Sequence, residues 1–408
     1  MTTTSFPKNK IKVLLLEGVH PECVRRFQDE GFSVEAHKGA MDEAELRKAI
    51  KGVHILGIRS KTQITRTVID KADRLLAVGA FCIGTNQIDV NAAMRNGIPV
   101  FNAPFSNTRS VAELVMTYMG MLFRGLYGKI KGAHNGEWSK ETSGSVEMRG
   151  KTIGIVGYGH IGQQVSVLAE AFGMRVLYFD VMDKLNMGNA TRAVDLRDLM
   201  ERSDVVTLHV PGTRETEGMI GRKELGWMRP GAFLLNASRG SVVEIGALAD
   251  ALDHGKLAGA AIDVFPVEPK SKEERFVSPL QGRDNVILTP HIGGATEEAQ
   301  RNIGLEVSGK LIRFTNNGST EGAVNFPSEV LPELRDHHRI LHIHQNVPGV
   351  LQKVNTMFGE AGINVAAQYL RTHEDVGYLI MDTDKSATRA MIRQLTELPE
   401  SIKVRALF

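Results

Sequence analysis

Along the N-terminal part of the chain, short apolar runs alternate with longer stretches in which apolar residues recur at helical spacing. The apolar runs, which predict buried strands, lie at residues 11–16, 32–36, 53–58, 75–79 and 98–101, and the predicted helices lie at 21–30, 42–51 and 66–72. Such alternation indicates a parallel sheet with helices on both faces. A long predicted helix, from residue 110 to about 131, leads away from this first unit.

A second series with the same alternation begins at residue 151. Its predicted strands lie at 152–156, 175–179, 204–209, 232–236, 259–263 and 285–288, and its helices at 161–172, 196–202 and 244–254. These are the elements of a complete dinucleotide-binding fold. We expect a further amphipathic helix, at 297–315, to pack back on the first unit, because its apolar face needs a partner.

The stretch from 316 to 337 is rich in Asn, Gly, Pro and charge, which is typical of a linker. Beyond it, the order strand, helix, strand, strand, helix, strand fits a ferredoxin-like βαββαβ unit. The sequence therefore predicts an α/β protein with two doubly wound parallel sheets. A flavodoxin-like domain covers 1–107 and 295–336, a Rossmann-like domain at 108–294 is inserted in it, and the βαββαβ domain covers 337–408.

The composition excludes several classes of protein. With 42% hydrophobic and 24% charged residues the chain is neither disordered nor fibrous, and a net charge of +2 provides no field for nucleic acid or a membrane surface. We expect Cys23 and Cys82 to be buried thiols, because two cysteines make neither a disulfide framework nor a metal site. Residues 1–10 are polar and no apolar run approaches 18 residues, so we expect a cytoplasmic protein.

A glycine-rich motif, Gly157-Tyr158-Gly159-His160-Ile161-Gly162, lies between a predicted strand and a predicted helix. In that context Gly157 allows a tight turn, Gly159 lets the backbone approach a pyrophosphate, and Gly162 allows close helix packing. Asp180 ends the next strand, where a carboxylate accepts hydrogen bonds from the adenosine ribose and repels a 2′-phosphate. The motif therefore predicts NAD as cofactor in preference to NADP.

Three polar residues, Arg239, Glu268 and His291, each follow an apolar run at the edge of the second predicted sheet where ligands gather. Oxidation of a 2-hydroxy acid needs a base for the hydroxyl proton, and a histidine titrating near neutrality suits that task. Glu268 would raise the pKa of His291 and orient its ring, and Arg239 would grip the substrate carboxylate. Taken singly, each of the three would more often be an ordinary surface or capping residue, and it is their placement around one crevice that favours a functional role.

At these residues the sequence resembles the D-isomer-specific 2-hydroxyacid dehydrogenases. The resemblance rests on residues 157–162, Asn-Ala-Ser-Arg-Gly at 236–240, Asp263-Val264-Phe265 with Glu268, and Thr-Pro-His-Ile-Gly-Gly at 289–294, and it covers nearly the whole chain. It implies catalytic roles for Arg239, Glu268 and His291. It also implies NAD contacts at His160, Ile161, Asp180, Ala237, Ser238, Arg239, Asp263, His291, Ile292, Gly293 and Gly294.

Within the family, the segment at 101–110 and the C-terminal domain resemble the members that oxidise 3-phosphoglycerate on the phosphorylated route to L-serine. A phosphorylated substrate needs cations, which Arg59-Ser60-Lys61 supplies, assisted by Asn107. The resemblance points to Arg where this chain has Lys61, and lysine lacks the fork geometry. Lys38 and Lys140 are further candidates, either reaching a neighbouring subunit's site or remaining solvated surface charges.

Trp138, near Lys140 in the sequence, is either an interface anchor or a core aromatic.

The C-terminal unit resembles an ACT domain, with His344 and Asn346 between its first strand and helix and Asn364 after that helix. The resemblance implies L-serine as an effector, held by these three residues between two subunits, in a homotetramer built through ACT pairs and nucleotide-domain pairs. The alternative is that His344 and Asn346 only cap the strand and the helix.

Two other functions remain open on the sequence alone. The same chemistry fits an unphosphorylated acid, such as 2-hydroxyglutarate formed from 2-oxoglutarate. A protein that binds NAD as a sensor, without turnover, shares the fold, although Arg239, Glu268 and His291 together argue against it.

Overall fold

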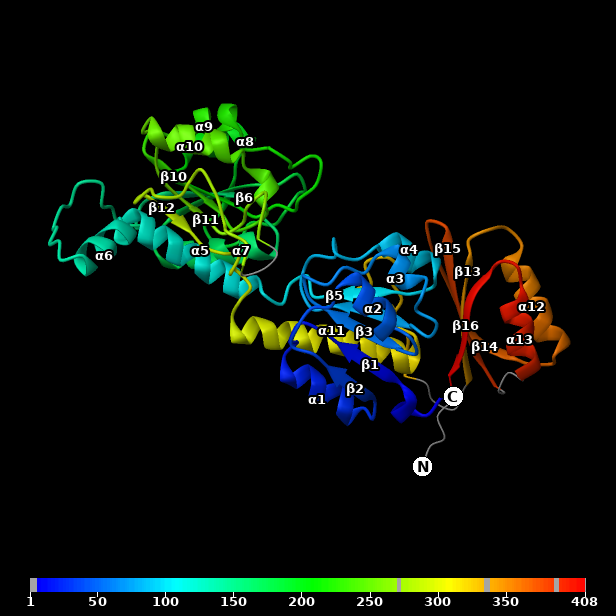
Figure 1. Ribbon diagram of the computed structural model, residues 1–408. Coiled ribbons are helices and arrows are strands. Elements are labelled where there is room, and N and C mark those ends of the chain that lie inside the picture. The colour runs from blue at the N-terminus through cyan, green and yellow to red at the C-terminus, as the bar shows by residue number, and fades with distance from the viewer. Residues whose placement is uncertain (1–5, 270–272, 334–337, 385–388, 408) are drawn as a thin grey trace. The chain divides into compact units, whose positions relative to one another are not determined.

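The computed structural model describes residues 6–269, 273–333, 338–384 and 389–407. Its contacts divide the chain into two compact units, one made of Met1–Ser106 and Gln300–Phe408 and the other of Asn107–Ala299 (Figure 1). The second unit is therefore inserted into the first. Both contain parallel sheets flanked by helices, and a small antiparallel sheet follows at the C-terminal end, which confirms the predicted fold class.

The first unit begins with a parallel sheet of order β2-β1-β3-β4-β5. The strands are β1 (Lys12–Leu15), β2 (Ser33–Ala36), β3 (Ile55–Ile58), β4 (Ala77–Ala80) and β5 (Val100–Asn102). The helices are α1 (Pro21–Asp29), α2 (Glu43–Ala49), α3 (Arg66–Ile69), α4 (Val90–Arg95) and α11 (Glu297–Asn317). Apolar residues of α11, among them Val307 and Leu311, share a core cluster with Val13 and Leu15 of β1. The expected return of this helix to the first unit is thus confirmed.

The inserted unit contains a seven-stranded parallel sheet of order β12-β11-β10-β9-β6-β7-β8. Its strands are β6 (Thr152–Val156), β7 (Arg175–Phe179), β8 (Thr191–Arg192), β9 (Val205–Leu208), β10 (Ala232–Asn236), β11 (Leu257–Ile262) and β12 (Val286–Leu288). Its helices are α5 (Thr108–Phe123), α6 (Leu126–His134), α7 (His160–Ala171), α8 (Leu196–Arg202), α9 (Arg222–Trp227) and α10 (Ile245–Asp253). Helices α5 and α7 cover one face, and α8, α9 and α10 cover the other (Figure 1).

The order of this sheet reverses between β6 and its neighbours β7 and β9. At such a switch point the loops that follow the strands diverge and leave a crevice for a ligand. The glycine-rich motif follows β6, so the topology places it at this crevice.

The C-terminal sheet has the antiparallel order β14-β15-β13-β16. It consists of β13 (His338–Gln345), β14 (Val365–His373), β15 (Val376–Thr383) and β16 (Ser401–Leu407), with α12 (Val350–Glu360) and α13 (Arg389–Glu397) on one face (Figure 1). The other face packs on Met94, Phe326 and Leu331 of the same unit. A bidentate ion pair between Arg339 and Asp382 is buried there, with bonds of 2.6 and 2.7 Å.

Several local expectations are wrong. The long helix predicted from residue 110 is two helices, because Gly125 adopts a left-handed conformation with φ of 57° between α5 and α6. The short elements α4, α9 and β8 were not predicted. Residues 318–333 contain no helix or strand, as the linker prediction requires, but they are packed on the first unit, where Asn325 is buried and hydrogen bonded to Val90, Ile98 and Val100. The predicted boundary at residues 336 and 337 lies outside the described residues.

The two cysteines differ in their surroundings. Cys23 is buried, as expected, and burial raises the pKa of its thiol to about 12. Cys82 is only half-buried, so the expectation that it is a core thiol is wrong. No helix in the described ranges is long and apolar enough to cross a membrane.

Candidate active site

The loop after β6 has the backbone that a dinucleotide pyrophosphate requires. Gly157 has φ of 90°, and a Cβ there would lie 2.4 Å from the carbonyl oxygen of His209. A Cβ at Gly162 would lie 2.3 Å from the Gly157 oxygen, whereas a Cβ at Gly159 would meet nothing within 4 Å. Gly157 and Gly162 are therefore required by the fold, and the open space at Gly159 fits the close approach of a phosphate to the N-terminus of α7.

Asp180 lies directly after β7, beside this loop. Its Oδ2 accepts a hydrogen bond from the Tyr158 amide and its Oδ1 accepts one from the Met182 amide, each at 2.8 Å. Each carboxylate oxygen keeps a further lone pair for a donor such as a ribose hydroxyl. The geometry fits the predicted role of Asp180 beside the adenosine ribose, and the site as a whole fits NAD.

His291 and Glu268 form the hydrogen-bonded pair that the sequence predicts. His291 Nδ1 lies 2.9 Å from Glu268 Oε2 and 3.1 Å from Oε1, which leaves Nε2 to face a substrate. The hydrogen bond that His291 donates to Glu268 raises the pKa of His291 against the opposing effect of burial. Burial acts to raise the pKa of Glu268, but the bond from His291, the His291 charge, the Phe265 amide and Arg239 together lower it.

The backbone of the histidine loop is held by a buried acid, Asp263, at the end of β11. Its Oδ1 accepts hydrogen bonds from the Thr289 hydroxyl at 2.6 Å and the Ile292 amide at 2.9 Å, and its Oδ2 accepts one from the Gly293 amide at 2.9 Å. The carbonyl oxygen of Asp263 accepts from the His291 amide at 2.8 Å. These bonds hold His291 in a left-handed conformation with φ of 54°, which is strained for a residue other than glycine.

Arg239 follows β10, the strand next to β11 in the sheet. It is half-buried, and its Nη1 donates to the Ser238 carbonyl at 2.7 Å. Its charge lowers the pKa of both Glu268 and His291. Arg239, Glu268 and His291 therefore interact electrostatically within one unit, at the edge where β10, β11 and β12 end.

This chemistry matches that of known proteins. Residues 116–293 match the model of the D-isomer specific 2-hydroxyacid dehydrogenase, NAD binding domain, and residues 340–403 match that of the AHAS small subunit-like ACT domain. D-3-phosphoglycerate dehydrogenase of Escherichia coli K12 is 51% identical over 411 residues, covering 100% of both chains. The Dictyostelium discoideum enzyme of the same name is 50% identical, covering 100% of this chain and 99% of its own.

The chain belongs to the D-isomer-specific 2-hydroxyacid dehydrogenase family. It is an NAD-dependent dehydrogenase with a C-terminal ACT domain. Among solved structures, D-2-hydroxyisocaproate dehydrogenase aligns with a TM-score of 0.71 and 28% identity over 78% of this chain and 100% of its own. D-lactate dehydrogenase from Aquifex aeolicus, solved with NAD and lactic acid, aligns with a TM-score of 0.68, 28% identity and the same coverage.

The residues predicted to bind substrate in this dehydrogenase fall in both units. Arg59, Ser60 and Lys61 follow β3 in the first unit, with Arg59 half-buried and the other two exposed. Asn107 begins the inserted unit, and its buried Oδ1 has no hydrogen-bond partner within the described chain. A Cβ at Gly294 would lie 2.7 Å from Asn107 Nδ2, so Asn107 packs on the end of the histidine loop.

The residues predicted to bind an effector do not converge within one chain. His344 lies on β13 opposite Gly377, and the Asn346 Nδ2 donates to the Glu374 carbonyl at 3.1 Å, so both lie at one end of β15. Asn364 precedes β14, and its amide donates to Asp384 beyond the other end of β15. At about 3.4 Å per residue, the strand separates the two groups by roughly 20 Å.

Two parts of the site were not predicted from the sequence. Tyr118 lies on α5, and its hydroxyl is hydrogen bonded to the hydroxyl of Thr289. Burial raises the pKa of Tyr118. His209 follows β9 at the cofactor crevice, and burial lowers its pKa to about 3. His209 directly follows an apolar run in the sequence, and this position could have identified it as a site residue, just as it identified Arg239. Tyr118 lies within a helical pattern and carries no such signal.

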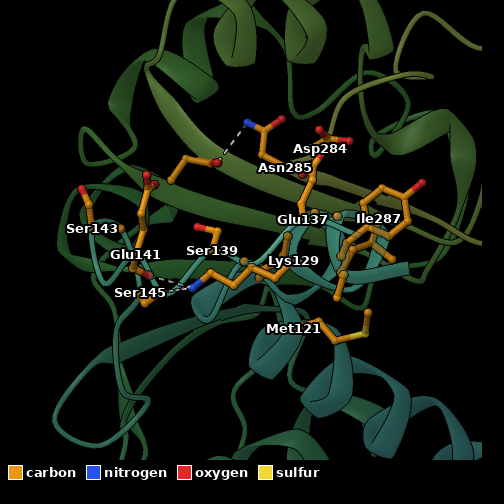
Figure 2. Close-up of a pocket in the computed structure, with 18 of the residues that line it drawn as sticks. Met121, Lys129, Glu137, Ser139, Glu141, Ser143, Ser145, Asp284, Asn285 and Ile287 are labelled. Carbon is orange, nitrogen blue, oxygen red and sulfur yellow. Dashed lines mark hydrogen bonds between the residues drawn. The ribbon is translucent and has the colours of Figure 1, made fainter. Parts of the chain in front are cut away.

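A cavity of about 600 Å³ lies elsewhere in the inserted unit, between α5, α6 and the segment 137–145 (Figure 2). None of the predicted catalytic residues lines it. Lys129 bridges the segment, donating to the Glu141 carbonyl at 3.1 Å and to the Ser145 hydroxyl at 2.9 Å. Trp138 on this segment is 84% exposed. The alternative that it is a core aromatic is therefore wrong.

Proposed function

We propose that this dehydrogenase oxidises D-3-phosphoglycerate to 3-phosphohydroxypyruvate, the first step of the phosphorylated route to L-serine. The observation that carries the proposal is the His291–Glu268 pair beside Arg239, in a chain that matches enzymes of that name over its full length. The pair can carry out the proton transfer that oxidation of a 2-hydroxy acid requires. The choice of D-3-phosphoglycerate as substrate rests on the names of the relatives.

The proposed chemistry follows from the atoms that face outward. His291 Nε2 takes the proton from the substrate's 2-hydroxyl, and Glu268 stabilises the imidazolium that forms at Nδ1. NAD⁺, which the loop after β6 and Asp180 would hold, would supply the acceptor for the hydride of carbon 2. Arg239 binds the substrate carboxylate through its planar fork. In the reverse direction the imidazolium returns its proton to the carbonyl oxygen, and the guanidinium polarises that carbonyl.

The substrate phosphate is assigned in this proposal to the loop at 59–61, assisted by Asn107. Support comes from two exposed or half-exposed cations at the carboxyl edge of a parallel sheet. Lys38 precedes α2 at the same edge of the sheet. Lys140 lies on the exposed segment beside Trp138, where it suits a role in a neighbouring subunit.

L-serine is the proposed effector of the ACT domain, with feedback inhibition as the outcome. His344 offers a buried Nε2 without a hydrogen-bond partner in the described chain. Because Asn364 lies at the opposite end of the strand ladder, a site that uses all three residues needs two subunits. The edge strand β14, which has one neighbour in the sheet, suits side-by-side pairing of two ACT domains.

We further propose a homotetramer, in which nucleotide domains also pair. Support comes from the apolar side chains exposed on and near α6, namely Tyr127, Ile130 and Trp138. The cytoplasm is the proposed location, because a phosphorylated acid and a dinucleotide are anions that do not cross a lipid bilayer unaided. Reduction of 2-oxoglutarate is a proposed side activity.

The deciding experiment follows NADH absorbance with 3-phosphohydroxypyruvate or 2-oxoglutarate as substrate, each with and without L-serine. The proposal predicts a kcat/KM at least tenfold higher for the phosphorylated acid, and inhibition by serine. An equal or reversed preference would assign the chain to another 2-hydroxy acid. Full activity at millimolar serine, together with no calorimetric binding of serine, would remove the regulatory part.

A further inference from the structure

A buried acid, Glu17, lies beneath the loop that carries Arg59 and Lys61. Strands β1 and β3 are paired in parallel, with Leu15 opposite Gly57, so the residues that follow them meet at the same edge of the sheet. Glu17 is 9% exposed. A carboxylate is seldom buried unless it is fully hydrogen bonded.

The Glu17 carboxylate is hydrogen bonded to the backbone of the cationic loop. Its Oε1 accepts from the amides of Arg59 at 3.2 Å and Thr62 at 2.8 Å, and its Oε2 accepts from the amide of Lys61 at 2.9 Å. Within the described residues, no ion pair engages the side chains of Arg59 or Lys61. The acid therefore organises the loop through its amides and leaves its cationic side chains available to an anion.

The backbone of Glu17 ties a second cation-bearing loop to the first. The Glu17 amide donates to the Gly39 carbonyl and the Gly18 amide to the His37 carbonyl, each at 2.9 Å. The two acceptors, His37 and Gly39, are the residues on either side of Lys38 in the chain, so these bonds fix the backbone around Lys38. Glu17 has φ of 64°, in the left-handed region that a glutamate rarely adopts. Such strain persists only where the surroundings impose it, and it is concentrated at functional sites.

The opposite face of the cationic loop is held by a neutral side chain. The side-chain Nε2 of Gln87 donates to the Arg59 carbonyl at 2.6 Å, and the backbone carbonyl of Gln87 accepts from the Ile64 amide at 2.8 Å. The loop is thus fixed at its amides by Glu17 and at a carbonyl by Gln87. Both contacts come from within the same unit of the chain.

We propose that Glu17 is a positioning residue for recognition of the substrate's phosphate group. It presents Arg59, Lys61 and Lys38 together at one edge of the sheet, so that little ordering of the loops remains when the anion binds. This inference rests on the proposed function. A glutamine would not replace the acid, because its amide has one acceptor oxygen and its NH₂ group would face a backbone N–H.

The test compares Glu17→Gln with the wild-type enzyme on the two keto acids. We expect the KM for 3-phosphohydroxypyruvate to rise about tenfold, the loss expected for one well-placed charge-assisted hydrogen bond. The kcat for that substrate and the KM for 2-oxoglutarate should change less than about twofold. Arg59→Ala should show the same selectivity. Glu22→Gln, which removes an acid from the exposed pair with Arg25, is the matched control.

A second measurement does not depend on any substrate. Hydrogen exchange followed by mass spectrometry should show faster exchange in the peptide containing residues 59–62 in Glu17→Gln, with unchanged exchange in the inserted unit. Glu17→Asp keeps the charge on a shorter arm and should have an intermediate effect on both readouts. Unchanged exchange at 59–62 would overturn the inference.

The outcomes separate this inference from the proposed function. If Glu17→Gln damages the KM for both acids equally, the residue is only structural and the inference is wrong. If the wild-type enzyme shows no preference for the phosphorylated acid, the proposed function fails. The exchange measurement then decides whether Glu17 positions the loop.

Discussion

Replacing Glu268 by Gln removes the charge that supports His291 and leaves a side chain of nearly the same size. The hydrogen bond that His291 donates to the Glu268 carboxylate raises the pKa of His291, so loss of the carboxylate lowers that pKa. Oxidation of the hydroxy acid needs neutral imidazole and rises with pH through the His291 pKa. Reduction of the keto acid needs imidazolium and falls through the same pKa. In Glu268→Gln both midpoints should therefore move to lower pH.

The size of the effect on rate follows from the exposure of the pair. A hydrogen bond to a charged group contributes about 1.5–3 kcal/mol. Here the side chains of His291 and Glu268 are 53% and 37% exposed, so solvent screening reduces this to about 1–1.5 kcal/mol. At about 1.4 kcal/mol per factor of ten, keto-acid reduction at neutral pH should slow about fivefold to twelvefold. Loss of the orientation of the His291 ring should slow the reaction further.

The assay is the pH dependence of kcat/KM in both directions, followed by NADH absorbance. Glu201→Gln, which removes an acid from a surface pair with Arg197 in the same unit, is the control and should leave the profile unchanged. If the midpoints of Glu268→Gln stay at the wild-type pH, or move to higher pH, the Glu268 carboxylate does not set the protonation state of His291.

Four further changes test other parts of the account. Lys61→Arg should lower the KM for the phosphorylated acid severalfold, since a guanidinium can bind phosphate through two N–H groups; a higher KM in steady-state assays would argue against a phosphate contact. Asp180→Ala should raise the Kd for NAD at least tenfold in a fluorescence titration and leave NADP unaffected; equal weakening of both would show a folding defect. His344→Ala should abolish serine binding by calorimetry with an unchanged kcat, and retained binding would exclude the proposed site. Asp382→Asn strands the buried charge of Arg339 and should cost about 3–5 kcal/mol in urea unfolding; a change under about 1 kcal/mol would mean that Arg339 finds other partners.

The hydrophobic pattern was sufficient for the order of strands and helices, because buried parallel strands read as apolar runs between amphipathic helices. It failed at Gly125, because a single glycine is tolerated within a helical pattern and only its left-handed φ reveals the break. The pattern also gave no sign that the linker at residues 318–333 packs on the first unit. There, polar residues such as Asn325 are buried by hydrogen bonds to distant backbone, which local composition does not register.

For the site, chemistry placed directly after an apolar run was predictable, as Arg239, Glu268 and His291 illustrate. The residues that hold these loops in place through hydrogen bonds were not predictable in that role. Glu17 also follows an apolar run, but its role depends on amides more than forty residues away in the chain. Asp263 was predicted as a cofactor contact, whereas its bonds to the histidine loop depend on the pairing of β11 with β12. Such roles follow from tertiary register, which spacing alone does not encode.

The most direct test of the central claim is turnover and NAD binding in His291→Ala, measured on the same preparation. Turnover of 3-phosphohydroxypyruvate should fall by about 10²–10⁴-fold, the usual contribution of a general acid or base, while the Kd for NADH should stay within about twofold of wild type. Turnover at the wild-type rate would contradict the assignment of His291 as the proton-transfer residue.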